Sequence, residues 1–288
     1  MKLALGTAQF GLNYGISNQS GIIKSEQAAR ILKDAHLAGI DTLDTAIDYG
    51  HSEAALGNLD VRSWKVVSKL PAIPPEYDDL RNWVKFQIKG SLDRLRVTKL
   101  HAILLHRPYQ LLEDIGPTLY DVLADMKSQG FVCKVGVSVY DPSELDSLFS
   151  KYSFDIVQVP LNILDRRFMD SGWISRLHLS GVEIHTRSVF LQGLLLMLPQ
   201  NRPQIFNQWE SIWDQWNHWL MKTNLTPLQA CIRYVNSISQ IDKIIVGVDS
   251  VSQLSEIIEA LGDSLDEIPD FGSVIDNRLI NPATWRLL

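Results

Sequence analysis

The chain has 288 residues, 45% of them hydrophobic, and a formal net charge of −6. This length suits one α/β barrel, which needs roughly 250 residues, and this hydrophobic content is typical of a globular protein with a sizeable core. Lysine and arginine are scattered along the chain, which argues against nucleic acid or an anionic membrane surface as the main partner.

The sequence offers little sign of export, membrane insertion or metal binding. Its apolar start is too short for a signal peptide and is better explained as a first strand, and no stretch approaches the roughly 20 apolar residues of a membrane span. Cys133 and Cys231 stand far apart, so we expect both to be reduced and buried. His178 and His185 lack a tight metal-ligand spacing, so no metal is expected, and the expected location is the cytoplasm.

Short apolar segments rich in β-branched residues alternate with longer segments of helical periodicity. In chain order, the predicted strands are residues 3–7, 42–46, 65–70, 102–106, 134–139, 156–160, 183–188 and 243–248. Eight strands, each followed by a helix-length segment, predict a single (β/α)8 TIM barrel domain over residues 1–288. A doubly wound open sheet is the alternative, but Gly6 and Gly11 stand too far apart for its glycine-rich turn.

Start signals precede several of the predicted helices. Ser25 stands before the amphipathic run 28–36, Asp141-Pro142 opens a helix that runs to residue 151, and Ser250 stands before the run 254–261. Four tryptophans at helical spacing form a stripe, for which core packing is favoured over a substrate lid. They are Trp209, Trp213, Trp216 and Trp219.

Four polar residues lie at or just beyond the ends of consecutive predicted strands. Asp44 lies in the second strand with Tyr49 in the loop beyond it, Lys69 ends the third strand and His106 ends the fourth. Functional groups of a parallel barrel come from the carboxyl ends of its strands, so we expect these four side chains to converge on one face.

Their residue types suit a proton donor. A free tyrosine has a pKa of about 10, and a neighbouring ammonium such as Lys69 is expected to lower the pKa of Tyr49. Asp44 supplies the counter-charge that keeps a buried lysine protonated. His106 is expected to hydrogen-bond a carbonyl oxygen or to hold the tyrosine hydroxyl in line. The four residues therefore predict a site that polarises a carbonyl group while a cofactor delivers hydride.

Taken together, these motifs resemble the aldo-keto reductase superfamily from residue 3 to about 262. The matching segments are Gly6-Thr7, Leu43-Asp44-Thr45-Ala46, Tyr49-Gly50, Ser52-Glu53, Ser68-Lys69, Leu105-His106-Arg107-Pro108, Gly136-Val137-Ser138, Gln158, Gln192-Gly193, Val246-Gly247 and Gln253-Leu254. The resemblance places the catalytic tetrad of the family on Asp44, Tyr49, Lys69 and His106.

The resemblance also implies a cofactor, NADP(H) with NAD(H) as the alternative. It assigns Ser138 and Gln158 to the nicotinamide amide, Gly6 and Thr7 to the ribose, and Gly193 to the pyrophosphate. It assigns three further residues to the adenosine end, where the start of a helix favours anions. These residues are Gly247, Ser250 and Gln253.

The chain departs from the family pattern at several cofactor positions. Val139 and Ile257 replace residues that are often Asn, and Ser250, with Asp249 beside it, stands where a basic residue often grips the 2′-phosphate. Arg187 stands where an aromatic ring often covers the nicotinamide. We expect its planar guanidinium to stack there instead, with a clamp on the pyrophosphate or on an acidic substrate group as the alternative.

The sequence thus favours a carbonyl reductase or alcohol dehydrogenase that acts on a small-molecule aldehyde, ketone or alcohol, sugar-like compounds included. A cofactor-binding regulatory or partner subunit is the alternative, against which the intact tetrad speaks. A hydrolase with Asp44 and Asp48 as paired carboxylates is disfavoured by the close spacing of the two. Tyr14, Tyr140 and Trp173 are candidates for the pocket wall.

Overall fold

The computed structural model describes residues 1–18, 21–75, 79–262, 265, 267–271 and 275–287. Eight parallel strands pair in chain order into a closed barrel, which confirms the predicted fold class. The strands are β1 (Leu3–Gly6), β2 (Thr42–Asp44), β3 (Lys65–Leu70), β4 (Leu100–Leu105), β5 (Val132–Ser138), β6 (Ile156–Pro160), β7 (Glu183–Arg187) and β8 (Lys243–Gly247). Strand β1 closes the ring, because Leu5 pairs with Leu43 of β2 on one side and with Val246 of β8 on the other.

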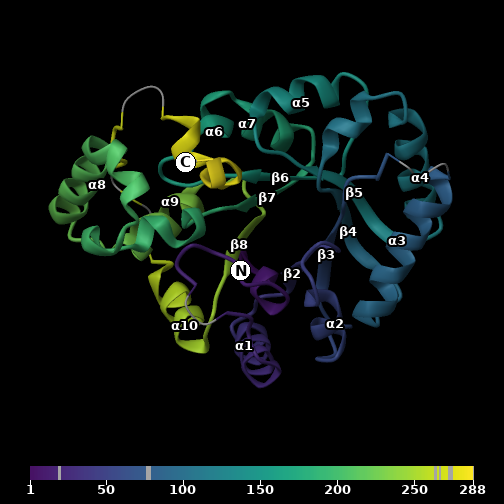
Figure 1. Cartoon of the computed structure of the whole chain (residues 1–288), viewed down its shortest axis with the longest axis horizontal. Coiled ribbons are helices and arrows are strands. Elements are labelled where there is room, and N and C mark those ends of the chain that lie inside the picture. Colours follow the sequence, from purple (N-terminus) through teal and green to yellow (C-terminus); the bar gives the residue numbers. More distant parts are fainter. Residues whose placement is uncertain (19–20, 76–78, 263–264, 266, 272–274, 288) are drawn as a thin grey trace.

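Helices surround the strands (Figure 1), as expected when each strand returns to the next through a helical segment. The α-helices are α1 (Ser25–Leu37), α2 (Ser52–Gly57), α3 (Leu80–Leu95), α4 (Gly116–Ser128), α5 (Pro142–Phe149), α6 (Arg167–Asp170), α7 (Trp173–Leu179), α8 (Glu210–Thr223), α9 (Pro227–Ser237), α10 (Val251–Ala260) and α11 (Asn277–Ile280). Short 3-10 segments are η1 (Ala8–Phe10), η2 (Pro108–Leu112), η3 (Leu191–Leu196), η4 (Pro199–Asn201), η5 (Gln204–Trp209) and η6 (Pro282–Leu287). Helix α8 lies at the left-hand edge of Figure 1, outside the ring of strands.

Two of the three predicted helix starts are confirmed. Asp141 caps α5 through a capping box with Glu144, and the Ser250 side chain caps α10 by accepting from the Gln253 amide. Ser25 is instead the first residue of α1, because Lys24 has the extended backbone of the capping position. Helix α5 ends at Phe149, short of the predicted residue 151.

The Trp209–Trp219 stripe packs into the core, as favoured by its spacing. All four rings are buried, and Trp216 stacks on Trp219 with their centroids 5.7 Å apart. Trp209 belongs to η5, just before α8. The prediction for the cysteines is half wrong: Cys231 is buried, but Cys133 is exposed, because it lies near the amino end of β5 at the rim of the barrel.

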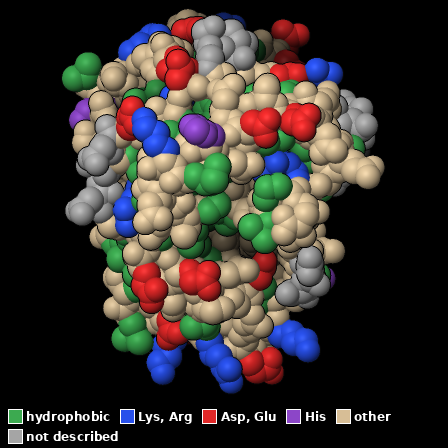
Figure 2. All heavy atoms as spheres, turned by 90° about the vertical axis from the view of Figure 1, so that its left-hand side faces the viewer, with side chains coloured by type: hydrophobic (Ala, Val, Ile, Leu, Met, Phe, Trp, Pro, Cys, Tyr) green, Lys and Arg blue, Asp and Glu red, His purple; other side chains and the backbone are tan. Residues whose placement is uncertain are grey.

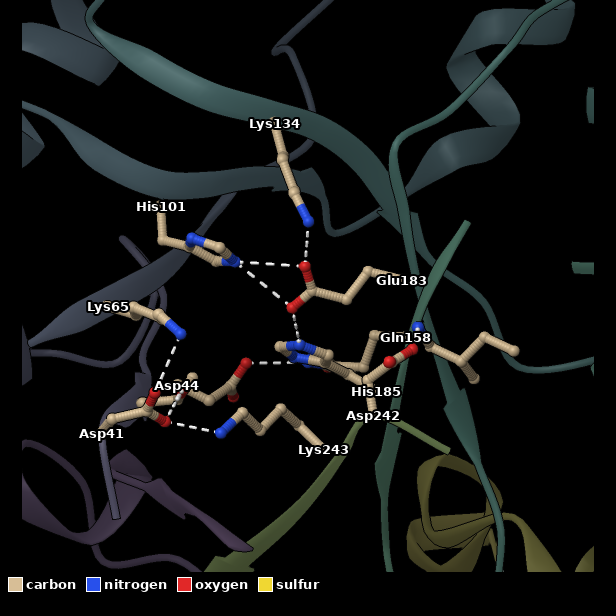
Figure 3. A network of polar contacts seen from close by, with 12 residues as sticks. Asp41, Asp44, Lys65, His101, Lys134, Gln158, Glu183, His185, Asp242 and Lys243 are labelled. Carbon is tan, nitrogen blue, oxygen red and sulfur yellow. Dashed lines mark hydrogen bonds and ion pairs between the residues drawn. The ribbon is translucent and has the colours of Figure 1, made fainter. Parts of the chain in front are cut away.

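Alternate residues of each strand point into the barrel, so one strand contributes to successive layers along the barrel axis. Between the two ends of the barrel lies a small apolar cluster of Val67, Ala102, Leu104 and Ile156. At the amino ends of the strands lies a network of ion pairs centred on Asp41 and Glu183 (Figure 3). At the carboxyl ends the inward positions are again polar, and they build the candidate site.

Candidate active site

Lys69 and Asp44 form a buried ion pair at the carboxyl ends of β3 and β2. The Lys69 Nζ lies 2.6 Å from Asp44 Oδ1 and donates also to the carbonyl oxygen of Thr45 at 2.9 Å. The second carboxylate oxygen of Asp44 accepts from Gln158 Nε2 at 2.7 Å. Asp44 is therefore fully engaged and cannot serve with Asp48 as a hydrolytic carboxylate.

The Tyr49 ring lies close to this ion pair and to the His106 ring. Lys69 Nζ is 5.0 Å from the centre of the ring, and the His106 ring faces it edge-on with centroids 6.0 Å apart. The structure thus brings together the four side chains that the sequence predicts, from β2, β3 and β4.

Two glycines hold the loop that carries Tyr49. A Cβ added at Gly11 would lie 2.0 Å from the Tyr49 carbonyl oxygen, and one added at Gly50 would lie 2.5 Å from the Gly11 carbonyl oxygen. Gly50 also has a φ of +55°, which favours glycine. The close contact between the two backbones therefore depends on the absence of both side chains.

The pKa of Tyr49 differs in direction from the expectation. Burial of the phenol raises its pKa well above the usual range, the Asp44 carboxylate raises it further, and Arg187 opposes both effects. The expected net lowering of the pKa does not result, because burial of the phenol and the Asp44 carboxylate together outweigh the positive charge near the ring. Without ligand, Tyr49 is a neutral phenol that holds its proton firmly.

His106 is a neutral imidazole at physiological pH. Burial lowers its pKa to about 3, and the positive charges of Lys69, Arg107 and Arg187 act in the same direction. Burial likewise lowers the pKa of Lys69, while Asp44 opposes the shift. His106 can therefore donate a hydrogen bond without carrying a charge into the site.

A cavity of about 320 Å³ opens from Asp44 and Tyr49 towards α10. Its size is typical of small-molecule and cofactor sites. The residues that line it are Gly6, Thr7, Ala8, Gln9, Tyr14, Gly15, Ser17, Asp44, Tyr49, Arg187, Ser188, Val189, Phe190, Gln192, Gly193, Leu196, Leu228, Ile245, Gly247, Asp249, Gln253, Glu256 and Ile257.

The loop after β7 forms one wall of this cavity in an unusual conformation. Ser188, Leu191 and Gln192 have φ values of 63°, 48° and 54°, a region that residues other than glycine rarely adopt. Gly193 follows with a φ of 89°, and a Cβ there would lie 2.0 Å from Ser17 Oγ on the opposite wall. Such a concentration of strained backbone is typical of a functional site.

Six of the nine residues assigned to the cofactor by resemblance line the cavity, namely Gly6, Thr7, Arg187, Gly193, Gly247 and Gln253. Ser138 and Gln158 lie deeper: both are buried, and Ser138 Oγ is 3.3 Å from Gln158 Oε1 behind Asp44. Their contact with a nicotinamide amide stays a prediction. Ser250 is outside the lining and uses its hydroxyl to cap α10.

Thr7 lines the cavity, but its hydroxyl is engaged elsewhere. It donates to the Asp44 carbonyl oxygen at 2.9 Å, and Ser52 Oγ donates to the Thr7 carbonyl oxygen at 2.8 Å. Ser52 also lies 3.0 Å from the Thr45 hydroxyl. These buried bonds tie the ends of β1 and β2 to the start of α2 and so fix the position of Asp44.

Arg187 lies at the mouth of the barrel without a carboxylate partner among the described residues. Its guanidinium is 4.3 Å from the centre of the Tyr140 ring and donates to the Val139 carbonyl oxygen at 3.0 Å and to Ser188 Oγ at 3.2 Å. It therefore brings an unneutralised positive charge close to Tyr49. Arg187 therefore does not neutralise a carboxylate of the described residues.

Several lining residues were not predicted from sequence. Gln9 packs against Gly247, where a Cβ would lie 2.5 Å from its side-chain amide nitrogen, and Ser17 and Glu256 come from a loop and an outer helix. Of the three residues that the sequence offered for the pocket wall, Tyr14 lines the cavity. Tyr140 packs against the Arg187 guanidinium, and Trp173 is buried outside the cavity against Phe149. Loop residues of this kind carry no periodic signal.

Metal-ligand clusters and membrane-spanning helices are both absent from the part of the chain that the structure describes. No three of its His, Cys, Asp or Glu side chains are grouped so that they could hold a metal ion. None of its helices is both long enough and apolar enough to cross a membrane.

Comparison with known proteins gives one family. The model of the aldo/keto reductase family matches residues 2–268 of the chain. No curated protein matches it significantly.

Solved structures share the fold at low sequence identity. A putative aldo-keto reductase from Pseudomonas aeruginosa is 23% identical, with a TM-score of 0.67 over 90% of this chain and 89% of that one. An aldo-keto reductase from Bacillus halodurans in its holo form is 19% identical (TM-score 0.71, 92% and 88% covered). A glycerol dehydrogenase from Gluconobacter oxydans is 21% identical (TM-score 0.70, 92% and 87% covered).

Proposed function

Because the chain belongs to the aldo/keto reductase family, we propose that it transfers a hydride between a nicotinamide dinucleotide and a small-molecule aldehyde or ketone, with Tyr49 as the proton donor. The reverse reaction oxidises the corresponding alcohol. The observation that carries the proposal is the convergence of Tyr49, His106 and the Asp44–Lys69 pair, of which Asp44 and Tyr49 line one cavity. We also propose that the protein acts in the cytoplasm.

The cavity has features that suit a dinucleotide. Gly193 and Gly247 line it, and added Cβ atoms there would collide with Ser17 and Gln9, so this close packing of the cavity walls requires glycine at both positions. The Oδ1 atom of Asp249, a lining residue near α10, is buried and has no hydrogen-bond partner in the part of the chain that the structure describes. When bound, the dinucleotide would supply or accept the hydride, with its nicotinamide beside Tyr49.

The residues of the chain handle the proton. Tyr49, kept protonated by its raised pKa, donates its proton to the carbonyl oxygen as negative charge develops there. Neutral His106 donates a second hydrogen bond to the same oxygen. Lys69, whose Nζ is 5.0 Å from the phenol ring, stabilises the phenolate that remains, and Asp44 keeps Lys69 charged and in place. The phenolate then regains a proton from solvent.

A panel of aldehydes, ketones, sugars and their alcohols tests the proposal, with turnover followed by nicotinamide absorbance. We expect at least one carbonyl compound to be reduced with NADH or NADPH as donor. Binding of neither dinucleotide in a fluorescence titration would contradict the proposal. Binding without turnover of any compound would favour a regulatory or partner subunit instead.

A further inference from the structure

The cavity has two chemically different ends. Asp44 and Tyr49 belong to the mouth of the barrel, whereas Gln253, Glu256 and Ile257 belong to α10 in the outer helix layer. If hydride transfer takes place at Tyr49, as proposed above, the adenosine half of the dinucleotide must extend towards α10. The side chains there decide which dinucleotide fits.

The end near α10 is acidic. Besides Asp44, the charged residues among the described lining are Arg187, Asp249 and Glu256. Arg187 lies close enough to Tyr49 to lower its pKa, so the single cation of the lining is at the other end. Figure 2, which shows the side of the molecule where α8 and α10 lie, has a hollow with acidic side chains at its lower border.

Asp249 is poised to accept a hydrogen bond. Its Oδ1 is buried and has no hydrogen-bond partner among the described residues, and burial raises the pKa of this carboxyl. A ribose hydroxyl can donate to this oxygen, whereas a phosphate at neutral pH offers mainly acceptors and carries between one and two negative charges. The same carboxylate therefore favours binding of an unmodified ribose and disfavours binding of a phosphorylated one.

The start of α10 does not offset this repulsion. A helix N-terminus attracts anions with the equivalent of about half a positive charge. Here, however, Ser250 Oγ accepts from the Gln253 amide, and Gln253 Oε1 accepts from the Asp249 amide at 2.7 Å. The Gln253 amide, one donor of the first turn, is thus used internally, and the full charge of Asp249 outweighs the partial charge of the helix.

We propose that this protein selects NAD(H) over NADP(H), with Asp249 accepting from the adenosine ribose and, together with Glu256, excluding a 2′-phosphate. The inference rests on the proposed function and reverses the cofactor preference that the family resemblance implies. It makes Asp249 a specificity-determining residue.

Dissociation constants of NADH and NADPH, measured by fluorescence titration without substrate, test the proposal. We expect the native protein to bind NADH at least about tenfold more tightly than NADPH. Asp249→Asn should tighten NADPH binding about tenfold and weaken NADH binding, because the charge is lost while the shape is kept. Ser250→Arg should tighten NADPH about 10–100-fold through a charge-assisted hydrogen bond.

Glu259→Gln is the matched control, since this residue of the same helix is exposed, carries the same charge and does not line the cavity. It should leave the NADH to NADPH ratio unchanged. Equal or tighter binding of NADPH by the native protein would overturn the inference and leave the proposed function standing. An equal effect of Asp249→Asn and Glu259→Gln on the NADH to NADPH ratio would overturn the role of Asp249. Binding of neither dinucleotide would contradict the proposed function itself.

Discussion

At the amino ends of the strands, Glu183 accepts hydrogen bonds from His101, His185 and Lys134, whereas at the carboxyl ends Arg187 has no carboxylate partner among the described residues. Figure 3 shows this network around Asp41 and Glu183, and it also labels Asp44 and Gln158 of the candidate site. Within the network, charges neutralise one another in a closed cluster. At the other end, Tyr49 and Arg187 face a cavity.

This difference separates residues that stabilise the barrel from residues available for chemistry. Both ends use the inward-facing positions of the same strands: Lys65 and Lys69 both belong to β3, and Glu183 and Arg187 both belong to β7. Residue type alone therefore does not identify a site. What identifies it is a buried or partly buried polar group that opens onto space for a ligand.

The largest effect is expected for Lys69→Met. It leaves Asp44 buried without its counter-ion, which costs about 3–5 kcal/mol of unfolding free energy. It also removes the charge that stabilises the phenolate, so kcat should fall by about 10²–10⁴-fold. Lys65→Met is the matched control at the other end of the same strand: its ion pair with Asp41 is exposed and is worth roughly 0–1 kcal/mol. Similar losses of kcat in both variants would contradict the division between a stabilising end and a catalytic end of the barrel.

Gly11→Ala should have the next largest effect. The new Cβ would collide with backbone atoms of residues 49–52 and displace the Tyr49 loop. A shift of about 1 Å can lower kcat by about 10²-fold, and the strain should cost about 1–3 kcal/mol. Gly90→Ala is the control, since its Cβ would meet only the flexible end of Arg94, 3.1 Å away. Full activity of Gly11→Ala would show that the loop tolerates movement.

Arg187→Tyr should change the balance between the two cofactor forms. Removing a positive charge near the nicotinamide should tighten the oxidised form relative to the reduced form by about two- to fivefold, because two unit charges 5–8 Å apart in water repel by roughly 0.5–1 kcal/mol. Arg107, which lies 5.7 Å from the same Tyr140 ring outside the cavity, provides the control substitution. An unchanged ratio with both forms weakened equally would assign Arg187 to a phosphate or to an acidic substrate group.

Glu183→Gln should have the smallest effect on turnover, within about twofold, while lowering the unfolding free energy by about 1–3 kcal/mol. Bonds from His101, His185 and Lys134 depress the pKa of Glu183. Its stabilising contribution is therefore complete above the unfolded pKa of about 4.3 and is lost as pH falls through the lower folded pKa. Denaturant titrations from pH 7 to pH 3 should show a flatter pH dependence for the variant. A large loss of kcat would place the amino end in the mechanism.

Much of the framework could be predicted from the sequence. All eight strands follow from apolar runs at regular spacing, and Asp44, Lys69 and His106 follow from the rule that strand ends meet at one face. That residues 1–288 form one domain stays a prediction. The amino-end network was missed, although Lys134 and Glu183 stand near strand starts at positions that alternation directs inward.

The rest depends on tertiary contacts that no local pattern encodes. The direction of the Tyr49 pKa shift follows from how deeply the fold buries the phenol and from Asp44 beside it. The exposure of Cys133 follows from its place near the amino end of β5. The cavity wall comes from the loops before α1 and after β7, whose conformation rests on contacts such as that of Gly193 with Ser17.

The central claim is that Tyr49 is the proton donor, and Tyr49→Phe tests it most directly when binding and turnover are measured on the same preparation. The phenol is needed where charge develops, not to hold the cofactor. We predict that dinucleotide dissociation constants stay within about twofold, while kcat falls by roughly 10²–10⁴-fold. Retention of more than about a tenth of the native kcat, with binding intact, would contradict the assignment of Tyr49 as the acid.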